Sequence, residues 1–109
     1  MTLWLGLDVG TSAVKAVIVD DEGQLRGQAE AGLSVARPRP LWSEQNPKHW
    51  WQAVGQAVCD LPAELRAGVA GIGIAGQMHG AVLLDRQDRA LRPAILWNDG
   101  RAAAECAVL

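Results

Sequence analysis

The sequence predicts an α/β domain whose mixed sheet opens with an antiparallel meander. Two apolar runs, residues 3–8 and 13–20, are separated by one short turn, so they can pair only as an antiparallel hairpin. A helical pattern over residues 47–60 then precedes another apolar run at 69–75, and a helix between two strands is typical of a parallel crossover. The predicted sheet therefore combines antiparallel and parallel pairing.

Composition and charge argue against several classes of protein. The chain has 109 residues, of which 50% are hydrophobic and 20% are charged, and this balance fits one small globular domain. The formal net charge of −2 and the lack of a basic run argue against a nucleic-acid partner. No apolar stretch approaches the ~20 residues that a membrane span needs, and there is no secretory signal pattern. Cys59 and Cys106 form no CxxC pair, so we expect reduced thiols in a cytoplasmic protein without a membrane partner.

The first three strands follow one another through short turns. Residues 3–8 predict a buried strand that delivers Asp8 to its C-terminal end. Residues 13–20 are rich in β-branched residues and predict the second strand. The sequence Asp-Glu-Gly at 21–23 is a turn signal, and residues 24–33 predict a third strand that is less apolar and therefore more exposed.

One helix separates this meander from the next strand. Two prolines in residues 36–46 fix φ and remove backbone donors, which predicts an extended loop without regular structure. The Asn-Pro pair at 46–47 is typical of a helix start, and Pro62 ends the helix. Between them, apolar residues form one stripe at helical spacing: Trp50, Ala53, Val54, Ala57, Val58 and Leu61. Residues 69–75 follow as a buried strand parallel to the first.

The last part of the chain is made of short segments. Residues 81–84 predict the start of a strand and residues 85–88 a polar turn. Residues 102–109 have helical propensity but neither a cap nor a stop signal. We therefore expect the chain to end within an element of a longer protein.

The most informative local feature is the sequence Asp-Val-Gly-Thr-Ser at 8–12. In such a turn, backbone N–H groups and the hydroxyls of Thr11 and Ser12 can face an anion, and Gly10 lets the backbone come close. An acid beside a phosphate is repulsive unless a cation lies between them, which predicts Mg²⁺ held by Asp8, through water, next to nucleotide phosphates. The alternative is a plain hairpin turn.

Longer segments along the chain resemble one family. They read Leu-Gly-Leu-Asp-Val-Gly-Thr-Ser at 5–12, Pro-Leu-Trp-Ser-Glu-Gln at 40–45, Trp-Trp at 50–51, Gly-Ile-Ala-Gly-Gln-Met-His-Gly at 73–80, and Leu-Arg-Pro-Ala-Ile-Leu-Trp-Asn-Asp-Gly-Arg at 91–101. The first segment resembles the phosphate turn of the sugar-kinase, actin and Hsp70 superfamily. Together the segments resemble the FGGY carbohydrate kinases, and among these the xylulokinases most closely. The last two segments are more specific than the turn.

The resemblance implies a fold and a reaction. The fold would be a ribonuclease-H-like (actin-like ATPase) α/β domain, and residues 1–109 would be the opening part of the N-terminal kinase domain. A second domain and the catalytic Asp would follow beyond residue 109, so we expect this chain alone to be inactive. The reaction would transfer the γ-phosphoryl group of ATP, with Mg²⁺, to D-xylulose and give D-xylulose 5-phosphate. A homodimer is one assembly that the protein could form.

By the same resemblance, two groups of residues form the site. MgATP would be organised by Asp8, with its phosphates held by Gly10, Thr11, Ser12 and Lys15. The sugar would be held by Gln77, Met78, His79, Trp97, Asn98, Asp99 and Arg101. An imidazole can exchange hydrogen bonds with a hydroxyl, and a methionine offers an adaptable apolar wall to the carbon skeleton.

Several of these roles have structural alternatives. Whether Lys15 faces the phosphates stays open, because a strand places it on the face of residues 13 and 17. Met78 and His79 could be a core methionine and a loop histidine. In the second cluster, Trp97 could be packed in the core, and Gly100 could close an Asx turn. Arg101 could pair with Asp99 as part of the structure.

Three functional alternatives remain at this point. One is another FGGY kinase, acting on glycerol, gluconate, ribulose or fuculose. The second is a non-catalytic, ATP-binding or filament-forming protein of the actin-like fold, which would lack a sugar loop. The third is a folding or interaction module, because an open sheet with exposed edges and apolar faces favours self-association.

Overall fold

The computed structural model describes all residues from Met1 to Leu109, and they form two compact units. The first unit comprises Met1–Leu33 and Lys48–Gln77, and the second comprises Ser34–Pro47 and Met78–Leu109. Each unit is built from two segments that are distant in the sequence. Long-range contacts therefore hold both of them together.

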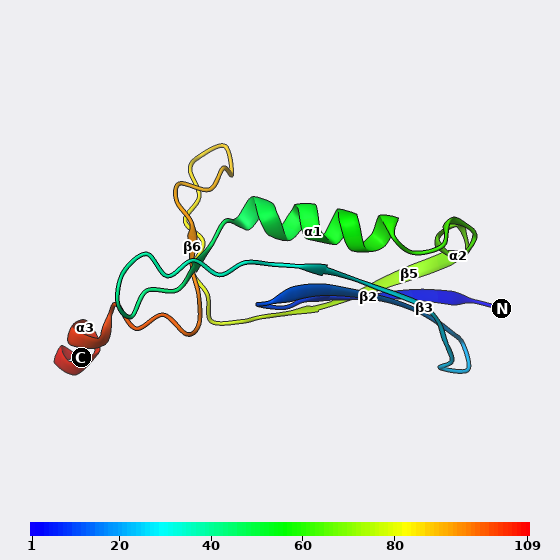
Figure 1. Ribbon diagram of the computed structural model, residues 1–109, viewed down its shortest axis with the longest axis horizontal. Coiled ribbons are helices and arrows are strands. Elements are labelled where there is room, and N and C mark those ends of the chain that lie inside the picture. Colours follow the sequence, from blue (N-terminus) through cyan, green and yellow to red (C-terminus); the bar gives the residue numbers. More distant parts are fainter. The chain divides into compact units, whose positions relative to one another are not determined.

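The first unit contains a four-stranded sheet in the order β3-β2-β1-β5 (Figure 1). Its strands are β1 (Leu3–Val9), β2 (Ala13–Asp20), β3 (Leu25–Gly32) and β5 (Val69–Gly76). The pairs β1–β2 and β2–β3 are antiparallel, whereas β5 is parallel to β1. The predicted meander and the predicted parallel crossover are thus confirmed.

The core of this unit lies between helix α1 (Pro47–Cys59) and one face of the sheet (Figure 1). Alternate residues of β1 and β2 point toward the helix, and the predicted apolar stripe of α1 points toward the strands. The buried set is Leu3, Leu5, Leu7, Val14, Ala16, Ile18, Ala53, Ala57 and Leu61. The intervening β1 residues Trp4 and Asp8 lie on the opposite face and are exposed.

Two sequence expectations for this unit need correction. The run that forms β5 was expected to be a buried strand, but its side chains Ile72 and Ile74 are 62% and 75% exposed. The reason is position: β5 is the edge strand next to β1, and the buried core side chains come from β1, β2, α1 and Leu61. The short helix α2 (Ala63–Ala67) was not predicted, because five residues are too few for an apolar period to emerge.

The second unit is built around two short antiparallel strands, β4 (Glu44–Gln45) and β6 (Ala94–Ile95). The loop 36–46 was expected to lack regular structure, yet β4 lies within it because Glu44 pairs with Ile95. Residues 81–84 form no continuous strand and make only isolated bridges at Ala81 and Leu84. The polar turn at 85–88 and a C-terminal helix, α3 (Ala103–Val108), are present as predicted.

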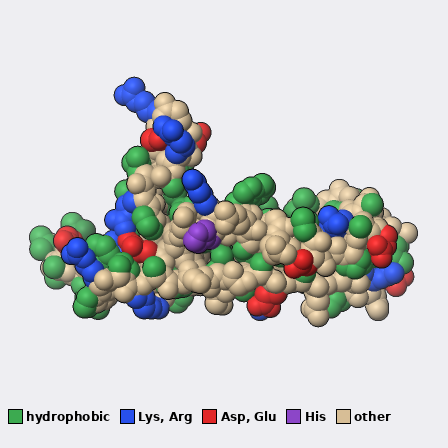
Figure 2. All heavy atoms as spheres, turned by 45° about the horizontal axis from the view of Figure 1, so that its top comes forward, with side chains coloured by type: hydrophobic (Ala, Val, Ile, Leu, Met, Phe, Trp, Pro, Cys, Tyr) green, Lys and Arg blue, Asp and Glu red, His purple; other side chains and the backbone are tan.

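The surface carries charged side chains of both signs together with large exposed hydrophobic side chains. Acidic and basic side chains are interspersed on the face drawn in Figure 2, and no single sign of charge dominates it. None of the helices is long and apolar enough to span a membrane. Cys59 and Cys106 are both exposed, and neither forms a disulfide.

Candidate functional site

The turn at residues 10–12 links β1 to β2 at the C-terminal end of β1. The Gly10 N–H donates to the Ala13 carbonyl at 3.0 Å, which closes the turn. A Cβ atom at position 10 would lie 2.9 Å from that same carbonyl oxygen, a distance that backbone atoms do not tolerate. Glycine is therefore required here by close backbone approach.

Gln77, the residue after β5, holds this turn through hydrogen bonds. The parallel pairing brings the end of β5 beside the end of β1, and Gln77 is the next residue along the chain. Its backbone N–H donates to the Val9 carbonyl at 3.0 Å, and its side-chain amide donates to the Gly10 carbonyl at 3.3 Å. The Thr11 hydroxyl donates to its amide oxygen at 3.4 Å. The sequence placed Gln77 with the sugar, whereas the structure places its side chain against the turn between β1 and β2.

Asp8 and Lys15 stand opposite each other in the β1–β2 register. Directly paired residues share a face, so both side chains lie on the face turned away from α1, and both are exposed. Neither takes part in an ion pair. Residues of β1, β2 and β5 line a hollow of about 470 Å³ that includes both. A ligand on that face can therefore reach both this carboxylate and this ammonium.

The donor set beside the turn suits Mg²⁺ only if a nucleotide supplies further oxygens. No cluster of three or more His, Cys, Asp or Glu side chains forms a closed metal site in the chain. Mg²⁺ is usually held by one or two carboxylates together with substrate phosphates and water. Asp8, as a single exposed carboxylate next to a turn with two hydroxyls, fits that arrangement.

In the second unit, Met78 and His79 are both exposed. His79 has a φ of 64°, in the left-handed region that is uncommon for residues other than glycine. The following residues fix this segment: Ala81 exchanges two backbone hydrogen bonds with Ile95, at 2.8 and 3.0 Å. A Cβ atom on Gly80 would meet the Ile95 carbonyl at 3.3 Å, so the segment packs closely on β6.

Trp97 and Asn98 follow β6 and occupy the corner of a tight turn. The Asp99 N–H donates to the Leu96 carbonyl at 3.0 Å, which closes that turn. Leu96 is buried, whereas Asn98 is exposed and Trp97 is 56% exposed. The alternative of a Trp97 packed in the core therefore does not hold, and its ring lies at the surface, where a ligand can reach it.

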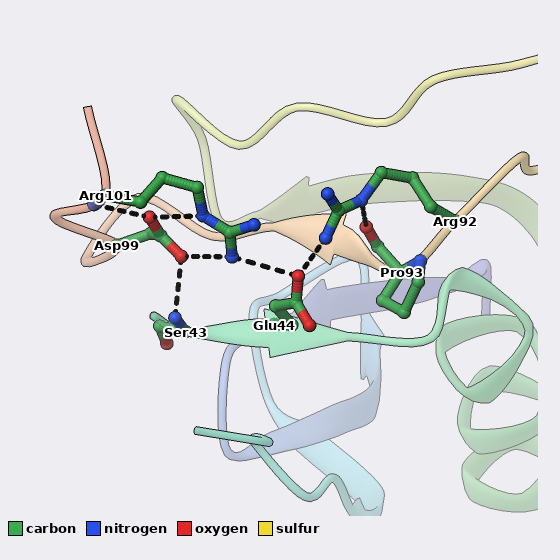
Figure 3. A network of polar contacts seen from close by, with 6 residues as sticks. All are labelled: Ser43, Glu44, Arg92, Pro93, Asp99 and Arg101. Atoms are coloured by element: carbon green, nitrogen blue, oxygen red, sulfur yellow. Dashed lines mark hydrogen bonds and ion pairs between the residues drawn. The ribbon is translucent and has the colours of Figure 1, made fainter. Parts of the chain in front are cut away.

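Asp99 and Arg101 form a partly buried ion pair with each other (Figure 3). The Asp99 side chain is only 2% exposed and that of Arg101 16%. Two guanidinium nitrogens of Arg101 donate to the carboxylate at 2.8 and 2.6 Å, and the Arg101 backbone N–H donates at 2.9 Å. The Ser43 N–H adds a fourth bond at 2.7 Å. The pairing that the sequence offered as the structural alternative is therefore present, together with the Asx turn.

The pair affects both ionisation equilibria. Hydrogen bonding to Arg101, and then to the Ser43 and Arg101 backbone N–H groups, holds the pKa of Asp99 well below its ordinary value, against the opposing effect of desolvation. Hydrogen bonds to Asp99 and Glu44 raise the pKa of Arg101. The Arg101 guanidinium also lies 3.7 Å from the centre of the Trp42 ring, a cation–π contact.

Three residues of this network were given no role from the sequence: Ser43, Glu44 and Arg92. Glu44 is 8% exposed by side chain and pairs with both Arg92 and Arg101. It stands in a segment with neither a helical nor a strand pattern, so nothing predicts that a carboxylate there is buried. The nearby prolines and Trp42 were the available signal of an ordered loop.

The structure thus sorts the predicted site residues into two groups. The first unit holds Asp8, Gly10, Thr11, Ser12, Lys15 and Gln77. The second holds Met78, His79, Trp97, Asn98, Asp99 and Arg101. Within the second unit, strand β6 connects the segment of Met78 and His79 with the segment of Trp97 and Asn98. Ile95 of β6 pairs with Ala81, and Trp97 lies two residues after Ile95.

Comparison with known proteins gives consistent matches. Residues 3–109 match the model of the N-terminal domain of the FGGY family of carbohydrate kinases. A xylulose kinase of Escherichia coli K12 is 51% identical over 108 residues, which are 98% of this chain and 22% of that protein. The chain therefore spans about a fifth of the length of the curated relatives it matches.

Solved structures agree with this result. A protein described as a xyloylose kinase from Brucella ovis superposes with a TM-score of 0.91 at 46% identity, over 97% of this chain and 23% of that one. A gluconate kinase from Lactobacillus acidophilus superposes with a TM-score of 0.91 at 28% identity, over 98% of this chain and 22% of that one. The predicted α/β fold is confirmed by these neighbours.

Proposed function

The chain belongs to the FGGY family of carbohydrate kinases, and we propose that it is the N-terminal part of a xylulose kinase. The whole enzyme would transfer the γ-phosphoryl group of ATP to D-xylulose and release ADP and D-xylulose 5-phosphate. The observation that carries the proposal is the exposed pair of segments around Met78-His79 and Trp97-Asn98, both connected to β6. Relatives described as xylulose kinases, at 51 and 52% identity, favour this sugar.

The nucleotide side of the proposal rests on the first unit. Asp8 would hold Mg²⁺ through water, and Mg²⁺ would neutralise charge on the ATP phosphates. The backbone of the Gly10 turn and the hydroxyls of Thr11 and Ser12 would donate hydrogen bonds to phosphate oxygens. Lys15 shares the face of Asp8, so its ammonium would meet the same anion. Gln77 would keep the turn in shape from the side.

The sugar side rests on the second unit. His79 would exchange a hydrogen bond with a sugar hydroxyl, and the thioether of Met78 would pack against the carbon skeleton. The Trp97 ring would cover an apolar face of the sugar, and the Asn98 amide would bind hydroxyls. Asp99 and Arg101 would act mainly by holding this turn, because their charges already satisfy each other. The base that accepts the hydroxyl proton would lie beyond residue 109.

The experiment is a coupled ADP-release assay on the full-length protein that contains this chain. The panel is D-xylulose, D-ribulose, gluconate and glycerol. We expect the highest kcat/KM with D-xylulose. A higher value with another sugar or polyol would reject the substrate while keeping the kinase. Binding of ATP with no turnover of any of them would reject the proposal of a xylulose kinase.

Gluconate is the second candidate substrate. It is favoured by one observation, the superposition with a gluconate kinase over nearly the whole chain. The lower identity, 28% against 51% for the xylulose kinase from Escherichia coli, ranks it second. The same panel separates the two.

Location and assembly belong to the proposal as well. We place the enzyme in the cytoplasm, and two exposed cysteines without a disulfide are in keeping with a reducing compartment. A homodimer is the assembly to test, by light scattering on the full-length protein.

A further inference from the structure

One carboxylate, that of Glu44, binds both ends of the segment from Arg92 to Arg101 (Figure 3). Its Oε2 atom accepts from Arg101 Nη2 at 2.9 Å and pairs with the guanidinium of Arg92. The segment between these arginines contains β6 and the exposed residues Trp97 and Asn98. Glu44 therefore closes a ten-residue loop by holding its two ends at one atom.

The middle of the same segment is fastened to the residues around Glu44. Glu44 pairs with Ile95 in the β4–β6 ladder. The Ser43 carbonyl accepts from the Leu96 N–H at 3.0 Å, and the Leu41 carbonyl accepts from the Gly100 N–H at 2.6 Å. Residues 41–45 thus contact the segment on both sides of its exposed corner, which is formed by Trp97 and Asn98.

The two arginines that Glu44 binds differ in how many other groups bind them. Arg101 has two carboxylate partners, Asp99 and Glu44, whereas Arg92 has only Glu44 and the Pro93 carbonyl. The Glu44 side chain is 8% exposed, so its charge is screened only weakly by water. Replacing it by a neutral amide would leave two neighbouring guanidinium groups with one carboxylate between them. Arg92, the weaker end, would be released first.

We propose that Glu44 is a positioning residue for the Trp97–Asn98 corner of the sugar pocket. This inference rests on the proposed function, because it takes that corner as a sugar contact. Glu44 does not contact the sugar in this scheme. It acts through Arg92 and Arg101, which keep the corner in the geometry that binds the sugar.

The test is Glu44→Gln in the full-length enzyme, with KM measured separately for the sugar and for ATP. Glutamine keeps the volume and removes the charge. We expect the sugar KM to rise about tenfold, as when a residue that orients a ligand-binding group is lost, with the ATP KM unchanged. A merely structural role would lower the amount of active enzyme and hence the apparent kcat, and would leave both KM values in place. Glu44→Asp keeps the charge and should restore part of the sugar affinity.

The matched control is Asp85→Asn. Asp85 pairs with Arg89 in the same unit, but that pair is exposed and lies outside the Glu44 network. We expect neither KM to change. An unchanged sugar KM in Glu44→Gln, beside an active wild-type enzyme, would overturn the inference while the proposed function stands.

Hydrogen exchange gives a second, activity-independent readout. The amide hydrogens of Leu96, Asp99, Gly100 and Arg101 are all bonded in the structure. In Glu44→Gln, or in Glu44→Asp where the first variant does not fold, we expect faster exchange over residues 94–101 and unchanged exchange in β1 and β2. If the wild-type enzyme phosphorylates no sugar in the panel, the proposed function fails and this measurement alone decides the role of Glu44. Equal exchange rates in variant and wild type would contradict that role.

Discussion

Ser43 makes two different contributions to the buried network, and they can be separated by mutation. Its backbone N–H and carbonyl bind Asp99 and Leu96, whereas its hydroxyl is fully buried and has no hydrogen-bond partner. An unpaired buried polar group costs free energy rather than supplying it. Ser43→Ala keeps both backbone bonds and removes only the hydroxyl.

We therefore expect Ser43→Ala to leave the free energy of unfolding of the full-length protein within about 1 kcal/mol of wild type, or to raise it. Denaturant unfolding measures the change. Leu96→Ala, at a buried apolar position of the same unit, is the comparison for a loss of core packing. It should lower the free energy of unfolding by about 2–5 kcal/mol. A comparable loss in Ser43→Ala would mean that the hydroxyl has a partner.

The depressed pKa of Asp99 predicts a pH dependence of stability. Arg101 holds that pKa below its ordinary value of 3.8, so the unfolded chain binds the proton more readily than the folded one. The stability that this carboxylate adds is complete above about pH 5 and is lost as the pH falls through and below about 4. We expect the gap in Tm between wild type and Asp99→Asn to be widest near neutral pH and to narrow between pH 5 and 3. A gap that stays constant over this range would contradict the assignment.

At the scale of residues, the structure shows the exposure and the contacts of the predicted site residues, and their roles in binding stay predictions. The exposure of Trp97 and His79 agrees with their place in a predicted pocket. Gln77 and Asp99 were assigned to the sugar because they lie in the matching segments, but their side chains are engaged with other parts of the protein. The contacts of such a side chain depend on residues that are distant in the sequence, and residue type and spacing do not identify those residues.

At the scale of elements, the turn between β1 and β2 offers the sharpest test. A methyl group at Gly10 would lie 2.9 Å from the Ala13 carbonyl, so the turn would have to shift in Gly10→Ala. Because that turn is proposed to bind phosphates, we expect the KM for ATP to rise about tenfold or more and the KM for the sugar to change little.

The control is Gly55→Ala in α1. A methyl group added at Gly55 would meet no atom within 4 Å, and alanine favours a helix over glycine by about 1 kcal/mol. We expect a slightly higher Tm and unchanged kinetics. Equal effects of the two substitutions on the ATP KM would reject the phosphate role of the turn.

Elements were predictable where a repeated pattern is long enough. The strands β1 and β2 and the helix α1 each carry an apolar period over at least seven residues, and the structure has all three at the predicted places. The strands β4 and β6 have two residues each, too short for any pattern. The exposure of β5 depends on its place at the edge of the sheet, and an apolar run alone does not reveal it.

For the molecule as a whole, the residues proposed for MgATP and the residues proposed for the sugar fall in different compact units. The residues proposed for MgATP belong to the first unit, and the exposed residues proposed for the sugar belong to the second. The sequence did not predict this division, because it arises from pairing between segments as distant as Glu44 and Ile95. Substitutions at the residues proposed for MgATP should therefore affect the KM for ATP, and those at the residues proposed for the sugar the KM for the sugar.

The central claim is that the exposed Met78-His79 segment binds the sugar of a kinase reaction. It is tested most directly by kcat/KM for D-xylulose in the full-length protein with His79→Gly. Glycine suits the φ of 64° at this position, so the substitution removes the imidazole without straining the backbone. His49→Ala, at an exposed histidine of α1, is the control. We expect kcat/KM to fall at least about tenfold in His79→Gly and to stay at the wild-type value in His49→Ala. Equal kcat/KM values for wild type and His79→Gly would contradict the claim.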